Sequence, residues 1–424
     1  MRKVQIILGP PGTGKTTTLL NIVEEALARG IAPERIAYLA FTRKAAYEAQ
    51  ERAMAQFGFD ESRFPYFRTL HSLAFRELGM QRDEVMTNSH YRKFGKAMGI
   101  EFRGIYDENI GLHTGDGLGD KCSRIESLAR VGLRTSAQYK MAILAASLAG
   151  EVYIAGDDDQ AIFGWAGADV HKFLNLKGQK TTLPNSHRIP RKVHALANDV
   201  ASRIKNRYPK KWEPKKDEGD VHYVTNEQEI DFSNPGTWML LSRSRYLLYR
   251  LKQAVRQQGF AYSINAKSSL ESEETRAIIA WESIRKGKRI SQHEAKNLIN
   301  FFGFTVNLLK QDSYGVEDLG LPDAARQYDW MTMLKGIAPD EREYLRSCMR
   351  NGEKFSDKPR ITISTIHQSK GGEADNLVLL TDMGKLSWEN LGGDEENRVW
   401  YVALTRAKEN LYLIQPKGLR YFAI

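Results

Sequence analysis

The sequence predicts an α/β protein of two parallel-sheet lobes, each interrupted by a mainly helical insertion. A short β-rich run at 4–8, a glycine-rich loop and a helix-like stretch at 16–30 open one alternating unit. A second alternation of strand and helix patterns begins at residue 237. Polar stretches at 76–135 and 286–357 lack this alternation, which indicates that they are insertions.

The first lobe is assigned to residues 1–75 and 136–182, on either side of an apparently shortened insertion at 76–135. After the opening unit, its predicted elements are a strand at 36–41, a helix at 43–58, a helix at 139–149 and a strand from Val152. Strands that alternate with helices favour a parallel sheet covered by helices.

The second lobe is assigned to residues 183–285 and 358–424, on either side of a compact insertion at 286–357. Its predicted elements are a strand at 237–244, a helix at 246–259, a strand at 260–264, strands within 361–372 and 376–381, and a helix and strand within 401–416. The insertion is polar and helix-prone, and no strand is predicted in it.

Composition points to a soluble protein with a polyanionic partner. The 424 residues carry a formal net charge of +10, and the sequence pI is about 9.3. No run approaches the ~18 apolar residues of a membrane span, and the first residues lead into a glycine-rich loop instead of a cleavage site. We therefore expect a cytoplasmic location without membrane association. The two cysteines, Cys122 and Cys348, lack the spacing of a disulfide scaffold or a zinc site.

A basic segment spans the middle of the chain. It contains Arg203, Lys205, Arg207, Lys210, Lys211, Lys215 and Lys216, together with Tyr208 and Trp212. A solvated basic face and a nucleic-acid contact both account for this composition.

Residues 9–16 match the pattern G-x-x-x-x-G-K-[ST] between a strand and a helix, which predicts a P-loop for a nucleoside triphosphate. The glycines let backbone N–H groups surround phosphate oxygens, Lys15 supplies a cation and Thr16 offers a hydroxyl to Mg²⁺. The predicted loop residues are Gly9, Pro10, Pro11, Gly12, Thr13, Gly14, Lys15 and Thr16. Kinases, GTPases, transporters and motors all share this loop, although no N-K-x-D stretch for guanine is present.

Six further stretches occur in a fixed order after the P-loop. They are AFTRKAA (40–46), TLHSLA (69–74), GDDDQAIFGWAGAD (156–169), SHR (186–188), STIHQSKGGEADNLVL (364–379) and ENRVWYVALTRAKENLYL (396–413). Taken together, the seven motifs resemble those of superfamily 1 DNA helicases of the UvrD/Rep/PcrA type. The resemblance implies two RecA-like lobes that clamp ATP, and 3′→5′ movement on single-stranded DNA.

The resemblance also implies roles at the nucleotide. Arg188 and Arg406 are expected at the γ-phosphate, both from the second lobe, where a guanidinium stabilises charge on the transferring oxygens. Gln160 resembles the γ-phosphate sensor, with Asp157 as its structural neighbour, and Glu373 resembles the ribose contact. With Lys15, the residues Gln160, Arg188 and Arg406 form the predicted catalytic set. Around the base, His187 stands in place of a stacking tyrosine and Thr17 in place of an arginine.

Contacts to DNA follow from the same resemblance. Phe41, Phe163 and Trp165 occupy positions that stack on bases, which suits movement over any sequence. Thr42, His71 and His367 are expected beside the DNA backbone. The expected partners are single-stranded DNA and junctions of single-stranded with duplex DNA.

One family feature is not found in the sequence. The family carries an Asp-Glu pair after an apolar strand, where it holds Mg²⁺ and orients the attacking water, and no Asp-Glu pair in this chain has that setting. Our hypothesis is that a segment with this strand is missing between about Gly132 and Thr135. The alternative function is therefore a nucleotide- and DNA-binding protein that does not hydrolyse ATP. A helicase-like subunit of a nuclease complex is less favoured, because no cluster of nuclease-type acids is present.

Overall fold

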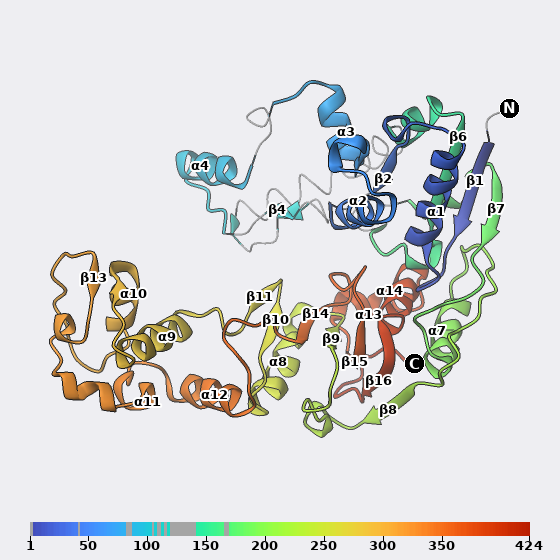
Figure 1. Cartoon of the computed structure of the whole chain (residues 1–424). Coiled ribbons are helices and arrows are strands. Elements are labelled where there is room, and N and C mark those ends of the chain that lie inside the picture. The colour runs from blue at the N-terminus through green and yellow to red at the C-terminus, as the bar shows by residue number, and fades with distance from the viewer. Residues whose placement is uncertain are drawn as a thin grey trace. The chain divides into compact units, whose positions relative to one another are not determined.

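The computed structural model describes residues 3–40, 43–81, 87–103, 106–107, 112–113, 117–118, 141–164 and 169–424 (Figure 1). Contacts divide the chain into two units. The first unit comprises Met1–Asp217 and Gly392–Tyr401, and the second comprises Glu218–Leu391 and Val402–Ile424. The α/β fold with large parallel sheets is confirmed, while the predicted boundaries of lobes and insertions stay a prediction.

Among the described residues, the main sheet of the first unit has three parallel strands in the order β6-β1-β7. The central strand β1 (Lys3–Leu8) pairs with β6 (Glu151–Gly156) and with β7 (Gln179–Thr182). The last three residues of β1 are buried because a central parallel strand is covered on both faces. Since the three strands run the same way, the loops that follow them start at one edge.

The other elements of the first unit surround this sheet. Strands β2 (Tyr38–Ala40) and β3 (Phe67–Thr69) form a separate parallel pair. The helices and short strands are α1 (Lys15–Ala28), α2 (Arg43–Phe57), α3 (Leu70–Glu77), α4 (Asn88–Met98), β4 (Tyr106–Asp107), β5 (Leu112–His113), α6 (Val170–Leu174) and α7 (Arg191–Ser202). Leu20 and Val23 of α1 pack against Phe64 and Phe67 in a small hydrophobic core.

The second unit has a sheet of seven strands in the order β11-β10-β14-β9-β15-β16-β8, all parallel except the edge strand β11. The strands are β8 (Asp220–Val224), β9 (Trp238–Ser242), β10 (Tyr262–Ile264), β11 (Lys267–Ser268), β14 (Ile361–Thr365), β15 (Ala374–Leu380) and β16 (Ala407–Ile414). Its outer helices include α8 (Leu248–Gln257) and α13 (Lys385–Glu389). Helix α14 (Asp394–Leu404) begins in the first unit and ends in the second.

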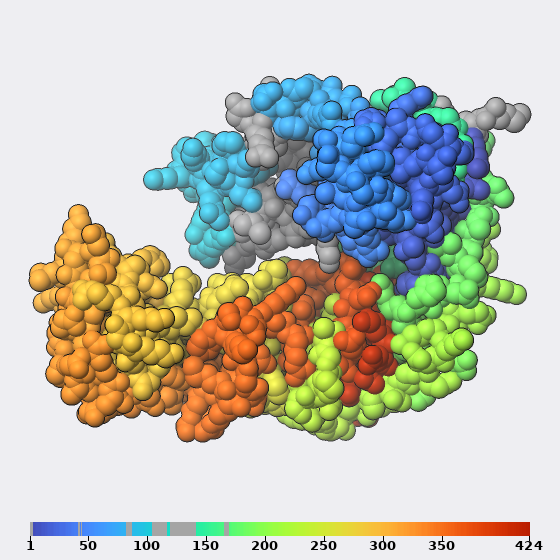
Figure 2. Space-filling view, in the orientation of Figure 1, coloured from blue at the N-terminus to red at the C-terminus, as the bar shows by residue number. Residues whose placement is uncertain are grey.

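The rest of the second unit is mainly helical, as the sequence predicts for 286–357, and is coloured yellow and orange in Figure 2. Its helices are α9 (Glu273–Arg285), α10 (Gln292–Ile299), α11 (Trp330–Met333) and α12 (Pro339–Arg350). Trp281 and Leu298 belong to the same buried core as Trp238 of the large sheet. The sequence shows no strand alternation there, and the structure adds a short pair in which β12 (Ile290–Ser291) lies beside β13 (Ser313–Tyr314). Two-residue strands are too short to give a periodic pattern.

Most predicted elements are confirmed where the structure describes them, including β1, α1, α2, β6, β9 and α8. Strands β7 and β8 were not predicted. Of the helices in the described ranges, none combines the length and the apolar composition needed to cross a membrane.

Candidate nucleotide-binding site

Three loops begin side by side at the carboxyl edge of the first unit's sheet. Leu8, at the end of β1, is in register with Gly156 of β6 and with Thr182 of β7. Backbone hydrogen bonds extend the pairing, from Gly9 N to Gly156 O and from Leu183 N to Leu8 O, both 2.9 Å. Ligands of open parallel sheets bind at this edge, so the three loops form a candidate site.

The loop after β1 has the backbone shape that its glycines predict. Gly12 and Gly14 have φ angles of 72° and 79°, in the left-handed region that favours glycine. Gly14 is the N-cap of α1, and the Thr13 hydroxyl donates to Pro10 O at 2.8 Å. The first turn of α1 has no acidic residue. Its N–H groups and the positive end of the helix dipole therefore favour an anion such as phosphate.

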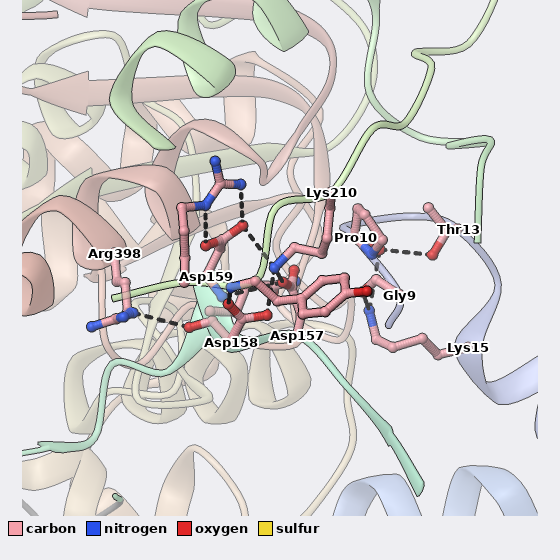
Figure 3. A network of polar contacts seen from close by, with 12 residues as sticks. Gly9, Pro10, Thr13, Lys15, Asp157, Asp158, Asp159, Lys210 and Arg398 are labelled. Carbon is pink, nitrogen blue, oxygen red and sulfur yellow. Dashed lines mark hydrogen bonds and ion pairs between the residues drawn. The ribbon is translucent and has the colours of Figure 1, made fainter. Parts of the chain in front are cut away.

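Lys15 lies across this loop (Figure 3). Its ammonium donates to Gly9 O and, at 3.2 Å, to Pro10 O. A Cβ at position 9 would lie 2.1 Å from Lys15 Cγ, so only glycine leaves room for the lysine stem. Thr16 is half-buried beside it, and Thr17 is exposed.

The segment after β7 packs directly on the loop. The buried Ser186 hydroxyl donates to Pro11 O at 2.8 Å, and His187 N donates to Gly12 O at 2.9 Å. A Cβ on Gly12 would lie 2.4 Å from Arg188 Cβ. The structure therefore brings His187 and Arg188 to the P-loop and groups this segment with the first unit, whereas the motifs place Arg188 in the second lobe.

The turn after β6 holds Gln160 by an aspartate. Asp157 is the N-cap of the short helix η4 (Asp158–Gln160), and its carboxylate accepts from Asp159 N at 3.2 Å. The same carboxylate accepts from Gln160 Nε2 at 2.6 Å, which confirms Asp157 as the neighbour of Gln160. Asp158 and Asp159 are buried, with exposed fractions of 1% and 0%.

Basic side chains from the segment after α7 neutralise this turn. The Lys210 ammonium lies 3.2 Å from Asp157, 2.5 Å from Asp158 and 2.9 Å from Asp159 (Figure 3). Arg207 donates to both oxygens of Asp159, at 2.9 and 2.6 Å. The three aspartates thus serve as counterions for protein cations.

The electrostatics of this cluster follow from its burial. Burial raises the pKa of the Asp159 carboxyl above its usual range, and the contacts with Arg207 and Lys210 oppose that rise. Burial disfavours the Lys210 ammonium, but the three carboxylates outweigh it, so the pKa of Lys210 also lies above its usual range. The attraction to the three carboxylates therefore favours the charged form of Lys210.

Few protein ligands for a metal are present in the described ranges, where no group of three or more His, Cys, Asp or Glu side chains is arranged to hold an ion. The acids of the turn are occupied by Lys210 and Arg207. Mg²⁺ that enters with a triphosphate is bound largely by phosphate oxygens. Thr16, in the first turn of α1, would be the protein ligand in that arrangement.

The basic segment 203–216 is therefore partly structural. The side chain of Lys210 is fully buried, Trp212 is 5% exposed, and Arg203 pairs with Asp199. Neither a uniformly solvated face nor a uniform nucleic-acid face describes it, and Lys211 is among its exposed residues.

Two family models match the chain. One, described as "UvrD/REP helicase N-terminal domain", matches residues 1–101 and 135–181. The other, described as "UvrD-like helicase C-terminal domain", matches residues 339–418. Together they cover just over half of the chain. The chain belongs to the UvrD-like helicase family.

Curated relatives are named as helicases of this family. An "ATP-dependent DNA helicase PcrA" of Leuconostoc citreum is 25% identical over 178 residues, which is 40% of this chain and 23% of the relative. The protein of that name from Staphylococcus aureus (strain MRSA252) is 22% identical over 404 residues, 68% of this chain and 54% of the relative. A "Probable DNA helicase II homolog" of Rickettsia felis is 22% identical over 388 residues, 67% and 59% respectively. The chain spans about half the length of these last two relatives.

The residues predicted to contact DNA in this UvrD-like chain are only partly described. Phe41, Thr42 and Trp165 lie outside the described residues. His71 is exposed in the first turn of α3, directly after β3, and Phe163 is half-buried beyond the aspartate turn. Their contacts with DNA stay predictions.

The remaining predicted residues of the UvrD-like motifs lie in the second unit. Arg406 is 1% exposed, and its guanidinium donates to Val402 O at 2.9 Å and to Gly372 O at 3.0 Å. Glu373 is exposed beside this contact, before β15, and His367 is half-buried after β14. The structure joins Arg406 to the loop that carries Glu373, and their roles at the nucleotide stay predictions.

That a segment carrying the family's Asp-Glu pair is missing from this chain stays a hypothesis. The matched ranges of the N-terminal model omit residues 102–134. The proposed gap between about Gly132 and Thr135 lies outside the described residues.

Sequence reasoning missed the roles of Lys210, Arg207 and Arg398. Arg398 of α14 donates to Asp158 O at 3.0 Å, in the first unit. The signal was available as charge complementarity, because three consecutive aspartates need nearby cations when they are buried. The sequence does not indicate which cation pairs with the aspartates, because seven basic residues lie within 203–216.

Proposed function

We propose that the protein is an ATP-dependent DNA helicase or translocase that moves 3′→5′ on single-stranded DNA. The observation that carries the proposal is the meeting of Lys15, Arg188 and the Gln160 turn at one sheet edge, in a UvrD-like chain. A P-loop alone would leave kinases and GTPases open. The motifs of both units narrow the choice to a motor on nucleic acid.

In the proposed reaction, the P-loop N–H groups and Lys15 bind the β- and γ-phosphates of ATP. Mg²⁺, held with the help of Thr16, would neutralise charge on those phosphates. Gln160 senses the γ-phosphate, and Arg188 and Arg406 stabilise the charge that develops on it. His187 and Thr17 border the base, and Glu373 binds the ribose.

Single-stranded DNA is the proposed track, and junctions with duplex DNA are the proposed site of strand separation. Phe41, Phe163 and Trp165 stack on successive bases, and Thr42, His71 and His367 approach the backbone. The net charge of +10 favours this polyanionic partner.

A second candidate is a nucleotide- and DNA-binding protein without hydrolysis. It is favoured by one observation: no Asp-Glu pair in the sequence follows an apolar strand, where the family carries its acid pair. Such a protein would bind ATP tightly and use it as a switch.

Steady-state ATPase assays with and without single-stranded DNA separate the two candidates. A motor shows DNA-stimulated turnover, which Lys15→Ala lowers by at least about 100-fold because a phosphate-binding cation is lost. Tight nucleotide binding without turnover supports the switch. An intact mass of 48.2 kDa on the same sample establishes that the assayed chain consists of these 424 residues and no inserted segment.

Polarity needs its own assay. Duplexes with a 3′ or a 5′ single-stranded tail are incubated with the protein and ATP, and the released strand is measured. Release from the 3′-tailed duplex alone supports the proposed direction, whereas release from the 5′-tailed duplex contradicts it.

A further inference from the structure

The Lys210 side chain fills a cage made by three carboxylates. It has an exposed fraction of 0%, as do the side chains of Asp158 and Asp159. The ammonium donates a hydrogen bond to Asp158 and forms ion pairs with Asp157 and Asp159, with N···O distances of 2.5, 3.2 and 2.9 Å respectively. These three contacts fix the position of the ammonium.

The charges of the cage depend on this lysine. Two cations bind the three carboxylates, since Arg207 donates twice to Asp159, and a third cation, Arg398, donates to the backbone oxygen of Asp158. Backbone donation from Tyr208 N to Asp158, at 2.8 Å, adds a neutral contact. Without Lys210, Arg207 would be the remaining cation among these carboxylate contacts, against three buried acids. Buried charges without partners are unfavourable, so the turn would have to rearrange.

Asp157 transmits the position of Lys210 to Gln160. Its Oδ1 faces the ammonium and Asp159 N, both at 3.2 Å. Its Oδ2 accepts from Gln160 Nε2 at 2.6 Å. The two oxygens of one carboxylate therefore connect the buried cation to the side-chain amide at the edge of the site.

The same chain segment touches the site at two points. Ser186, at its start, donates to Pro11 O of the P-loop, and Lys210, after α7, binds the turn that carries Gln160. Arg188 lies within this segment. One chain segment therefore contacts both the P-loop, through Ser186, and the turn that carries Gln160, through Lys210.

We infer that Lys210 is a positioning residue for nucleotide sensing: its ammonium fixes Asp157, and Asp157 orients the Gln160 amide toward the γ-phosphate. This inference rests on the proposed function, because it uses the proposed role of Gln160. Lys210 itself contacts neither nucleotide nor DNA in this scheme.

The ratio of the affinities for ATPγS and ADP measures how well the protein senses the γ-phosphate, and it does not require hydrolysis. We expect Gln160→Ala to lower the ratio of the two affinities by at least about 10-fold, as for a lost hydrogen bond to a charged group. Lys210→Ala is expected to lower it by a similar factor. The double variant is expected to lose no more than either single variant, because both changes remove one interaction. Lys211→Met, at the neighbouring exposed lysine, is the control and leaves the ratio unchanged.

Chemical rescue provides a second readout. n-Propylammonium has the atoms that Lys210→Ala removes, and adding it is expected to restore the ratio in this variant but not in Gln160→Ala. Circular dichroism melts establish that each variant is folded. Should Lys210→Ala fail to fold, Asp157→Asn replaces it, because it breaks the same connection while removing a buried charge.

The outcomes are distinguishable. Additive losses in the double variant, or an unchanged ratio in both Lys210→Ala and Asp157→Asn, overturn the inference while the proposed function stands. A wild-type protein that binds neither nucleotide contradicts the proposed function, and the inference falls with it. Equal, non-additive losses with rescue by n-propylammonium support the inference.

Discussion

At the scale of single residues, Gly12 is constrained twice. Its φ of 72° costs a residue with a Cβ about 1–2 kcal/mol, and the added Cβ would lie 2.4 Å from Arg188 Cβ. We expect Gly12→Ala to displace the segment around Arg188 and weaken ATPγS binding by at least about 10-fold. Fluorescence titration with a labelled nucleotide measures this change.

Gly30 provides the matched control for that prediction. Its φ is 81°, but a Cβ there would meet nothing within 4 Å. Gly30→Ala should therefore lower the melting temperature through backbone strain and leave nucleotide affinity unchanged. Equal affinities in Gly12→Ala and wild type would show that contact with Arg188 does not shape the loop.

Arg250 is the centre of a partly buried ion-pair network in the second unit. It lies 3.0 Å from Glu227 and 2.7 Å from Asp382. Burial alone would raise the pKa of Glu227, but Arg250 and Lys417 lower it to about 2. A carboxyl whose folded pKa is depressed contributes stability above its unfolded pKa of 4.5, and this contribution is lost as the pH falls toward about 2.

We therefore expect Arg250→Met to destabilise the unit by about 3–5 kcal/mol at pH 7. The difference from wild type should narrow between about pH 5 and pH 2, where Glu227 becomes protonated. Urea unfolding at several pH values measures both effects. Lys385→Met removes an exposed pair with Glu389 and should change little. A difference that does not depend on pH would show that Glu227 is not the responsible acid.

At the scale of elements, the loop after β7 is hydrogen-bonded to the P-loop and stabilises its conformation. The Ser186 hydroxyl donates to Pro11 O and accepts from Arg188 N and Ile189 N, at 3.2 and 3.1 Å. Ser186→Ala leaves these buried groups unsatisfied, at a cost of about 1–3 kcal/mol. We expect a lower melting temperature together with weaker nucleotide binding.

An exposed serine tests whether this effect is specific. Ser202, at the end of α7, is exposed and donates to Asp199 O within its own helix, so Ser202→Ala should change neither property. If Ser186→Ala lowers stability but binds nucleotide like wild type, the loop stabilises the fold without shaping the site.

Some elements of the fold could be predicted from sequence patterns, and others could not. Strand β1 and helix α1 were predicted because a motif and an apolar periodicity coincide there. Strand β7 has the sequence QKTT, which has no apolar pattern from which a strand could be predicted. Its place in the sheet is fixed by backbone pairing with β1. Strand β8 is an edge strand with Tyr223 64% exposed, so burial imposes little pattern on it.

At the scale of the whole molecule, motifs indicate the candidate site residues but not the contacts that support them. Lys15, Gln160 and Arg188 were predicted because they belong to ordered motifs. Lys210 was not, because its contact with Asp158 joins positions 52 residues apart and depends on the path of α7. Local sequence limits which residue types can neutralise buried acids, but only the three-dimensional fold selects the one that does.

The final prediction concerns coupling between nucleotide and DNA. Gln160 and Trp165 lie five positions apart on the same stretch, so movement of one should affect the other. By thermodynamic linkage, any factor by which ATPγS changes affinity for single-stranded DNA must equal the factor by which that DNA changes affinity for ATPγS.

We expect Trp165→Ala to weaken DNA binding by about 5- to 150-fold, from the loss of one stacked base, and to reduce both coupling factors equally. Fluorescence anisotropy in both directions measures them, with Tyr223→Ala as the exposed aromatic control. Unchanged DNA affinity in Trp165→Ala would show that Trp165 does not contact DNA. Weaker DNA affinity with unchanged coupling factors would show that another residue couples the two sites.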